Sequence, residues 1–337
     1  MPIQQMLVGI GAGEKFAEAT GGDAITTVGD YKVHAFTSSG TFTVTQLGDT
    51  NEFETLIVAG GAGPGTQWTQ GGGGGGGIIN HQTGQALTAA AYTITVGGGG
   101  AGAPYGTGWT TFFADGTPGS DSSIKLASNN SIVLEADISD IANLPGMSLP
   151  NPQANNKYSW NVYMHSTGGN SAKVVNGVTT QYVGRGGWHQ TAYAGGGAGA
   201  GEDGDPPNST SDSTQSYTPQ WANGGGCSFG GGGGDGYATN MVTGSTTYYG
   251  GGGGAGTGGV GCNGGGSYAH NNNTAPGGQG GGGNGSSIGP GNSTSSGTAA
   301  QNGTANTGGG GGGGSQYRNS GNGGSGVVYI KYKFQAS

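Results

Sequence analysis

The chain has 337 residues; 86 of them are glycine, 31% are hydrophobic and only 8% are charged. A net charge of −8 without any Lys/Arg-rich run excludes a nucleic-acid-binding surface. No stretch is apolar enough to span a membrane, and Met1–Ile10 lacks the basic and apolar regions of a secretion signal. We therefore expect no membrane insertion and a route out of the cell other than secretion.

The first part of the chain predicts an arm followed by strands. Residues 1–30 are mixed in composition and predict an N-terminal attachment arm. Strand-forming residues then alternate in Tyr31–Phe36 and Thr41–Thr45, with a turn between them. A third strand, Glu54–Ala59, leads directly into the first glycine run. These segments predict a β-strand module over residues 31–59.

Two later segments are predicted to join this module, and one interrupts what lies between. Residues 86–96 contain the strand pattern Ala91–Val96, and residues 327–334 alternate in the same way. The glycine-poor residues 103–194 predict a mixed insertion with its own small core. Within it, Asp137–Leu144 has apolar residues spaced for one face of a short helix.

Glycine runs dominate residues 60–326, and the longest are Gly71–Gly77 and Gly308–Gly314. Collagen is excluded because the chain has only 12 prolines and no Gly-X-Y period. A polyproline-II-like helix leaves every backbone group unpaired, so such glycine helices have to bond to one another. The sequence predicts a mostly irregular/β fold, a bundle (sandwich) of about ten polyglycine II helices joined by loops. The N-terminal strands and the C-terminal strand form a small β-sheet module beside it.

If successive runs alternate in direction, the loops divide between the sheet end and the opposite end of the bundle. Aromatic side chains on loops held by a rigid scaffold suit a recognition surface. The loops predicted to lie far from the sheets, including residues 235–249, carry most of the aromatic residues. The predicted receptor-binding residues are Trp68, Trp109, Trp160, Trp188, Tyr237, Tyr248, Tyr249, Tyr268 and Tyr317.

The sequence contains no pattern that requires catalysis, a cofactor or a metal. GxGxxG matches follow from the composition and lack a strand–loop–helix context, and the five histidines are isolated in sequence. We therefore predict no enzyme, no catalytic residue, no cofactor and no metal site. A Ca²⁺ site at Glu202–Asp205 and a disulfide between Cys227 and Cys262 stay open alternatives.

Several ordered segments carry a resemblance to a known group of proteins. They are Tyr31-Lys-Val-His-Ala-Phe-Thr-Ser-Ser-Gly-Thr-Phe-Thr-Val, Leu56-Ile-Val-Ala-Gly-Gly-Ala-Gly, Tyr92-Thr-Ile-Thr-Val followed by four glycines, Gly119-Ser-Asp-Ser-Ser, and Gly324-Ser-Gly-Val-Val-Tyr-Ile-Lys-Tyr. Together they resemble the glycine-rich domain of phage tail and tail-fibre proteins, over residues 31–123 and 308–334. The alternation of glycine tracts with variable loops is similar, more loosely, to the distal adhesins of T-even-like phage long tail fibres.

The resemblance implies a virion protein at a tail-fibre tip that recognises a host cell-surface receptor, either an outer-membrane protein or a glycan. It implies a second partner, another tail-fibre or virion protein, bound through the N-terminal region. The protein would be assembled in the host cytoplasm and reside in the virion. The alternative is a structural virion or filament-forming protein whose glycine-rich faces mediate assembly. The oligomeric state stays open.

Overall fold

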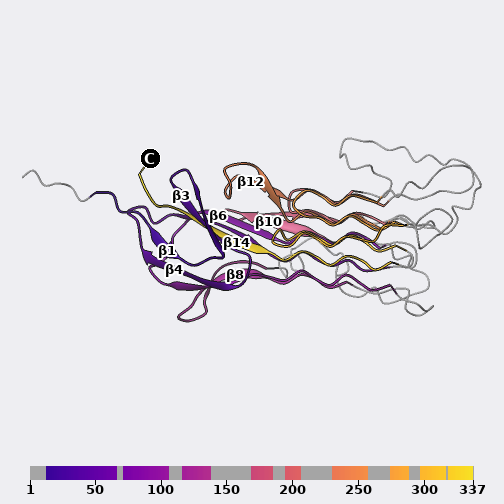
Figure 1. Cartoon of the computed structure of the whole chain (residues 1–337), viewed down its shortest axis with the longest axis horizontal. Helices are drawn as coiled ribbons and strands as arrows, with labels where there is room; N and C mark the ends of the chain where they lie inside the picture. The colour runs from indigo at the N-terminus through magenta and orange to yellow at the C-terminus, as the bar shows by residue number, and fades with distance from the viewer. Residues whose placement is uncertain are drawn as a thin grey trace, which may run out of the picture.

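The regular structure of the chain consists of β-strands. The computed structural model describes residues 13–66, 71–105, 116–137, 168–184, 194–205, 230–256, 274–287, 297–315 and 318–336. These ranges contain three sheets, of seven, five and two strands, and no helix. The sheets gather at one end of an elongated molecule, from which extended glycine-rich segments run to the other end (Figure 1).

The largest sheet has the strand order β11-β10-β6-β5-β14-β3-β2. Its neighbouring strands are antiparallel, apart from the parallel pair of β10 and β6. The strands are β2 (Ala24–Val28), β3 (Tyr31–Phe36), β5 (Phe53–Val58), β6 (Ile79–Gln85), β10 (Ser171–Val175), β11 (Val178–Tyr182) and β14 (Val327–Lys333). The C-terminal strand thus lies in the middle of the sheet, between β5 and β3.

The five-stranded sheet has the order β1-β4-β7-β8-β9 and is antiparallel throughout. Its strands are β1 (Glu18–Thr20), β4 (Gly40–Gln46), β7 (Ala91–Thr95), β8 (Ser122–Leu126) and β9 (Ile132–Ala136). Alternate residues of both sheets point inward and form one buried core, as expected for a sandwich. That core includes Phe36, Phe42, Phe53, Ile57, Tyr92, Ile94, Ile124, Ile330 and Tyr332.

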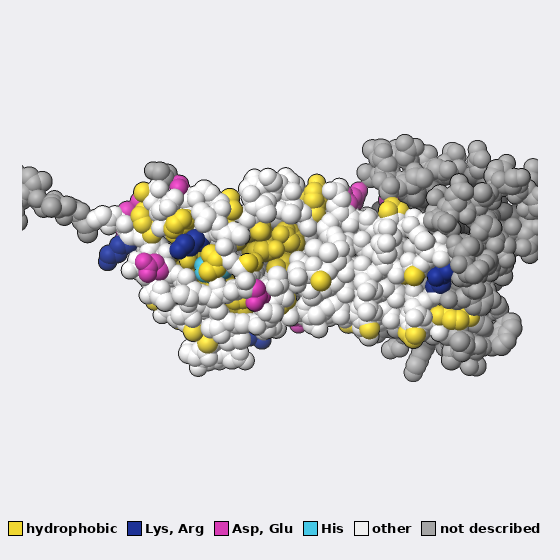
Figure 2. Space-filling view, viewed as in Figure 1, with side chains coloured by type: hydrophobic (Ala, Val, Ile, Leu, Met, Phe, Trp, Pro, Cys, Tyr) yellow, Lys and Arg dark blue, Asp and Glu magenta, His cyan; other side chains and the backbone are white. Residues whose placement is uncertain are grey.

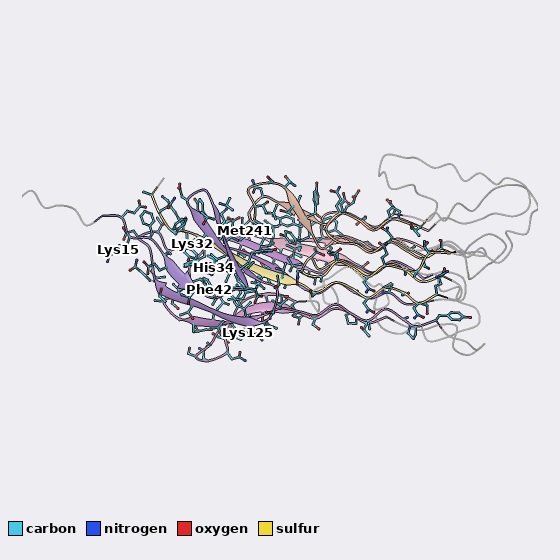
Figure 3. The ribbon with its side chains drawn as sticks, in the orientation of Figure 1. Lys15, Lys32, His34, Phe42, Lys125 and Met241 are labelled. Atoms are coloured by element: carbon cyan, nitrogen blue, oxygen red, sulfur yellow. The ribbon has the colours of Figure 1, made fainter. Side chains whose placement is uncertain are left out.

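Aromatic rings organise the centre of this sandwich. The rings of Phe42 and Phe53 meet edge to face with centroids 6.4 Å apart, and the rings of Phe53 and Tyr332 lie 5.5 Å apart. His34 is fully buried beside them, with its ring 5.2 Å from that of Phe42. Figure 3 shows Phe42 and His34 together in the space between the two sheets. Edge-to-face pairs of this kind add to the free energy gained from burial.

The outer face of the seven-stranded sheet is covered by a two-stranded hairpin of β12 (Tyr237–Thr239) and β13 (Thr247–Tyr249). A second buried cluster joins the hairpin to the sheet; it contains Leu56, Val58, Ile79, Ala200, Met241, Tyr249 and Val327. Met241 projects from the hairpin toward the sheet (Figure 3). The hairpin therefore lies at the sheet end of the molecule.

The remaining described segments form what we call the glycine body. It consists of residues 59–66, 71–77, 97–105, 116–121, 168–170, 194–205, 230–236, 250–256, 274–287, 297–315 and 318–326, most of which lack strand assignment. These segments run side by side away from the sheets (Figure 1). Most of their backbone amides donate to carbonyls of a neighbouring extended stretch. Where one range turns back on itself, the bonds join its two halves, as from Gly196 to Asp205 and from Gly312 to Gln301. Figure 2 shows a glycine-body surface largely free of hydrophobic and charged side chains.

The bonds between two of these segments repeat every three residues. The amides of Gly71, Gly74 and Gly77 donate to the carbonyls of Gly314, Gly311 and Gly308, at 2.6, 2.8 and 2.6 Å. Bonds to a different neighbour alternate with these along the same segment, because Gly73 and Gly76 donate to residues 195 and 198. Successive amides of one segment thus point to different neighbours.

The predicted fold class is wrong. The described residues contain no helix, and the regular elements are the strands of three sheets, so the chain is a β-sheet-rich protein and not a bundle of polyglycine II helices. The predicted single β-module is also divided between two sheets: the segment at Thr41–Thr45 and that at Ala91–Val96 belong to the five-stranded sheet. Strand pairing and the sandwich core determine the fold class, because the strand segments contain most of the large apolar side chains.

Some predicted segments fall on particular elements. The predicted strands coincide with β3, β4, β5, β7 and β14; the ends are identical for β3 and lie within one residue for the other four. Within the predicted arm, residues 18–20 and 24–28 are edge strands β1 and β2. Of the predicted helix Asp137–Leu144, all residues after Asp137 lie outside the described ranges.

Candidate functional site

The end of the glycine body opposite the sheets, which we call the far end, is held together by backbone and side-chain bonds. There Gly256 donates its amide to the Gly71 carbonyl at 2.9 Å. The Ser320 hydroxyl donates to the Gly65 carbonyl at 3.1 Å, and Tyr105 donates its amide to Oδ1 of Asn319 at 2.7 Å. Segments distant in sequence therefore end next to one another.

Segment 250–256 shows how closely the glycine body is packed. It exchanges backbone hydrogen bonds with segments 71–77, 194–200, 230–236, 274–279, 281–287 and 308–315. A Cβ added at Gly253 would overlap the carbonyl of Gly311, and one at Gly73 would overlap that of Gly253. Glycine is required here because neighbouring backbones occupy the space of a side chain. This packing gives the far end a stiff support.

At the surface of the glycine body, where no further backbone segment is available as an acceptor, side-chain oxygens accept hydrogen bonds from backbone amides. Oδ1 of Asn322 accepts the amide of Gly102 at 2.9 Å, and Oδ1 of Asp235 accepts the amide of Gln279 at 2.7 Å. The same arrangement recurs for the donor–acceptor pairs Ala101–Thr117, Tyr105–Asn319, Val183–Asp203, Gly184–Asn170 and Gly277–Asn284. Short polar side chains thus pair amides that would otherwise face solvent.

Six of the nine predicted receptor-binding residues lie outside the described ranges: Trp68, Trp109, Trp160, Trp188, Tyr268 and Tyr317. Two of these are close in sequence to described residues of the far end. Trp68 comes two residues after Thr66, and Tyr317 stands between Ser315 and Arg318. The Thr66 hydroxyl donates to the Pro104 carbonyl at 3.2 Å, and the Arg318 guanidinium donates to the Gly297 carbonyl at 2.6 Å.

The other three predicted residues, Tyr237, Tyr248 and Tyr249, belong to the β12–β13 hairpin. The expectation that residues 235–249 lie far from the sheets is wrong, since this hairpin packs on the seven-stranded sheet. The reason is a short segment that the sequence did not reveal. Residues 201–202 reverse the chain at the sheet end, and Gly204–Asp205 runs back beside Gly196 and Gly232. Segments 230–236 and 250–256 therefore run opposite to the predicted direction, and the turn at Gly280 and Gly281 restores the predicted direction for segment 308–314.

Tyr249 is an anchor of the hairpin. It is 5% exposed, its ring meets that of Tyr329 at 5.7 Å, and its hydroxyl donates to the Tyr329 hydroxyl at 3.2 Å. Burial, followed by this hydrogen bond, raises the pKa of Tyr249. Directly opposite in the hairpin, Tyr237 is half-buried and faces the same sheet. Tyr249 therefore has little surface to offer a partner.

A chain of polar contacts under the hairpin was missed by the sequence analysis, which treated His81 as isolated. His81 Nε2 donates to Oε1 of Glu54 at 2.9 Å, and Lys331 donates to Oε2 of the same carboxylate at 2.9 Å. In the neutral ring, Nδ1 of His81 then accepts from the Tyr237 hydroxyl at 2.7 Å. The alternation of inward and outward side chains along β5, β6 and β14 was the sequence signal that Glu54, His81 and Lys331 lie on one face of the sheet.

The electrostatics of this chain of contacts hold it in one arrangement. The hydrogen bond from His81, reinforced by Lys331, lowers the pKa of Glu54 although burial raises it. Burial, with the Glu54 charge nearby, raises the pKa of Tyr237. Lys173 adds a second cation, 5.6 Å from the ring centroid of Tyr237. The contacts consist of ion pairs and hydrogen bonds that fasten the hairpin to the sheet.

Within the described ranges, no group of three or more His, Cys, Asp or Glu side chains gathers closely enough to hold a metal ion. At the segment considered for Ca²⁺, Asp203 accepts the amide of Val183 at 2.8 Å. Cys227 and Cys262 lie outside the described ranges. The described segments also include no apolar helix of membrane-spanning length.

The fold and the far end together define a glycine-rich β-protein: a sheet sandwich that carries a backbone-bonded body of extended segments. Residues 37–333 match the model of the glycine-rich domain family, and the chain belongs to that family. This agrees with the glycine-rich part of the resemblance and carries no information about a phage. No curated protein and no solved structure matches the chain.

Proposed function

We propose that this chain is a phage virion adhesin that recognises a host cell-surface receptor with the far end of its glycine body. The observation that carries the proposal is the meeting of many chain segments at one end, as at Gly65, Gly71, Gly256 and Ser320. Segments far apart in the sequence thus end side by side there, at positions fixed by hydrogen bonds. The phage origin rests on the sequence resemblance.

The stiffness of the support favours binding. A connecting segment held by bonded neighbours at both ends loses less conformational entropy when a receptor binds it. The Gly311 and Gly253 segments are fixed in this way by backbone bonds on several sides. Recognition residues are often found on connections of this kind, because a rigid scaffold tolerates changes in them.

The opposite end suits attachment to the virion. Both β1 and β2 lie at the sheet end, and they come from the N-terminal region expected to bind another tail-fibre or virion protein. A partner bound there is separated from the far end by the length of the glycine body (Figure 1). The two binding events would therefore not compete for surface.

Cell binding tests the proposal directly. Fluorescently labelled protein is added to intact cells of a panel of bacterial strains, and bound protein is measured by flow cytometry. We expect saturable binding to some strains, lost in Trp68→Ala and Tyr317→Ala. The matched control is Tyr248→Ala, on the hairpin at the sheet end, which keeps binding. Protease treatment of the cells separates a protein receptor from a glycan.

Loss of binding in the hairpin variant alone, or saturable binding to no strain, would overturn the proposal. The alternative, a structural or filament-forming protein, predicts self-association through glycine-rich faces. In several places the surface amides that a second molecule would need already donate to side chains of the same chain, as the Gly102 amide does to Asn322. Sedimentation velocity distinguishes the adhesin from the filament-forming protein. A filament-forming protein sediments as large species, whereas an adhesin functions without self-association into filaments.

A further inference from the structure

The free edge at β2 lacks the protection that edge strands β1 and β9 carry. Every residue of β2 is exposed or half-exposed, and Ile25 is 53% exposed. Its five residues, Ala-Ile-Thr-Thr-Val, include no charge and no proline, and its pairing with β3 has no register shift. Sheet edges are normally protected by charged residues, proline, bulges or short length.

Two other edges carry such protection. β1 has only three residues and a register shift between Glu18 and Ala19. β9 contains Glu135, and its pairing with β8 shifts between Ile124 and Lys125. The fourth edge, β11, is uncharged and unshifted like β2, and it provides a comparison at the other side of the same sheet.

The hairpin geometry fixes which groups of β2 face outward. A two-residue turn, Gly29–Asp30, joins Val28 to Tyr31, with Gly29 at φ 59°. Residues flanking such a turn form a hydrogen-bonded pair, and the pattern alternates along the strand. The backbone groups of Val28, Thr26 and Ala24 therefore point to β3, whereas those of Ile25 and Thr27 point away from the sheet.

The charge at the N-terminal end of this edge indicates which flanking residue a partner strand needs there, whereas Lys32 of β3 lies opposite Thr27 farther along. Asp23 precedes β2, and its carboxylate accepts only uncharged donors among its hydrogen bonds, from Thr37 and Ser38. These bonds, the largest from the Ser38 amide, lower the pKa of Asp23, so the carboxylate stays charged. The chain as a whole carries a net charge of −8. A basic residue in a partner complements this end of the edge.

We propose that β2 is the docking edge for a partner protein, which adds an extended segment to the seven-stranded sheet beside Ile25 and Thr27. The segment has an uncharged, strand-forming centre and a Lys or Arg near Asp23. Main-chain bonds supply most of the affinity in this mode, and the flanking charge sets direction and specificity. The inference rests on the proposed attachment at the sheet end and specifies how it is made.

The probe is a synthetic peptide with a Thr-Val-Thr-Ile-Thr centre flanked by lysines, compared with the same centre flanked by glutamates. Binding to the full chain is measured by fluorescence anisotropy. We expect the lysine-flanked peptide to bind more tightly, with slower hydrogen exchange at the amides of Ile25 and Thr27. Asp23→Asn reduces the preference for the lysine-flanked peptide.

Two substitutions at one position block the edge by different means. Thr27→Pro removes an outward amide without touching the bonds to β3, and Thr27→Lys adds a charge that repels the basic flank. Each is expected to weaken peptide binding by about tenfold or more, the effect of losing one or two hydrogen bonds. The matched control is Thr179→Pro, whose amide points outward from β11, and it leaves binding unchanged.

Absence of saturable binding up to the solubility limit, equal binding by the Thr27 variants, or equal loss in the β11 control would overturn the inference. So would a wild-type dimer that Thr27→Pro converts to a monomer in sedimentation velocity, because the edge would then serve a second copy of the chain. Circular dichroism confirms that each variant is folded. Cell binding by Thr27→Pro stays unchanged if the far end binds the receptor, so a failed docking edge and a failed adhesin are distinguishable.

Discussion

The amide of Gly253 donates to the carbonyl of Gly74 at 2.8 Å, although the two glycines lie far apart in the sequence. Gly74 in turn donates to Gly311 at 2.8 Å. Three segments are thus joined by two successive bonds between main-chain groups. Such contacts exist only where no side chain keeps the backbones apart.

Replacement of Gly253 by alanine should therefore destabilise the protein. A Cβ at this position overlaps the Gly311 carbonyl, and the surrounding backbone has no flexible side chain that can move aside. We expect the free energy of unfolding to fall by about 1–3 kcal/mol, as for overpacked cores. The control is Gly98→Ala, where nothing lies within 4 Å of the added Cβ. Equal melting temperatures for the two variants in calorimetry would contradict the packing described.

Ser122 joins a strand of one sheet to the other sheet and to the glycine body. Its hydroxyl accepts the amide of Gly97 at 2.9 Å and donates to the carbonyl of Val58 at 2.7 Å, and its side chain is fully buried. Ser122→Ala leaves both groups buried without this partner, which should cost about 1–3 kcal/mol of stability. Chemical denaturation measures the loss, and Ser131→Ala, at an exposed position, should change little. A neutral effect of Ser122→Ala would show that another group satisfies both atoms.

His34 should make stability depend on pH. Burial lowers the pKa of this imidazole below 6.5, against a raising effect of its bond to the Gly21 carbonyl at 2.7 Å. The unfolded chain therefore binds a proton more readily than the folded chain. Stability is fully present above pH 6.5 and declines as the pH falls through 6.5 toward the lower folded-state value.

The corresponding measurement is the free energy of unfolding between pH 8 and pH 5 for the wild type and His34→Gln. The variant is expected to be less stable at pH 8, because it loses the ring contacts with Tyr332 and Phe42. Its stability should nevertheless fall less steeply with decreasing pH. Parallel pH curves would assign the acid sensitivity to other groups.

The Tyr249 hydroxyl provides a test of how the hairpin is held. Tyr249→Phe keeps the ring contact with Tyr329 and removes the hydroxyl pair, which should cost about 1 kcal/mol. Hydrogen exchange of the hairpin amides should accelerate, since local opening becomes easier. Tyr248→Phe is the comparison, on the neighbouring residue of β13. Unchanged exchange in Tyr249→Phe would indicate that His81 and Met241 suffice to hold the hairpin.

Alternating strands were predictable from sequence, because each has a full set of apolar residues on one face. The ends of β3, β5 and β14 follow from this pattern to within one residue. The fold class was not predictable in the same way. Composition shows that the backbone groups of a glycine segment have to form hydrogen bonds with other segments. It does not show whether these bonds or the apolar core between the two large sheets determines the fold class.

The direction in which each glycine segment runs was also not predictable from the sequence. Glycine adopts positive φ without strain, so a reversal inside a glycine run leaves no mark in composition. The chain turns at Gly280 and Gly281, with φ of 93° and 92°, inside what the sequence presents as one run. The short return at Gly204–Asp205 spans too few residues to show in the sequence pattern, and it moved the hairpin tyrosines to the end opposite the one predicted.

Bonds that repeat every three residues also constrain how the length of such a protein can change. Removing three residues from one segment and three from its antiparallel neighbour restores the same donors and acceptors, as the series from Gly71 to Gly77 illustrates. Removing one or two would turn those amides toward different neighbours. Lengths compatible with the network therefore differ in steps of roughly 10 Å, three residues of extended chain. Within a family of such proteins, insertions in multiples of three would be tolerated inside the segments, and insertions of any length where the segments connect.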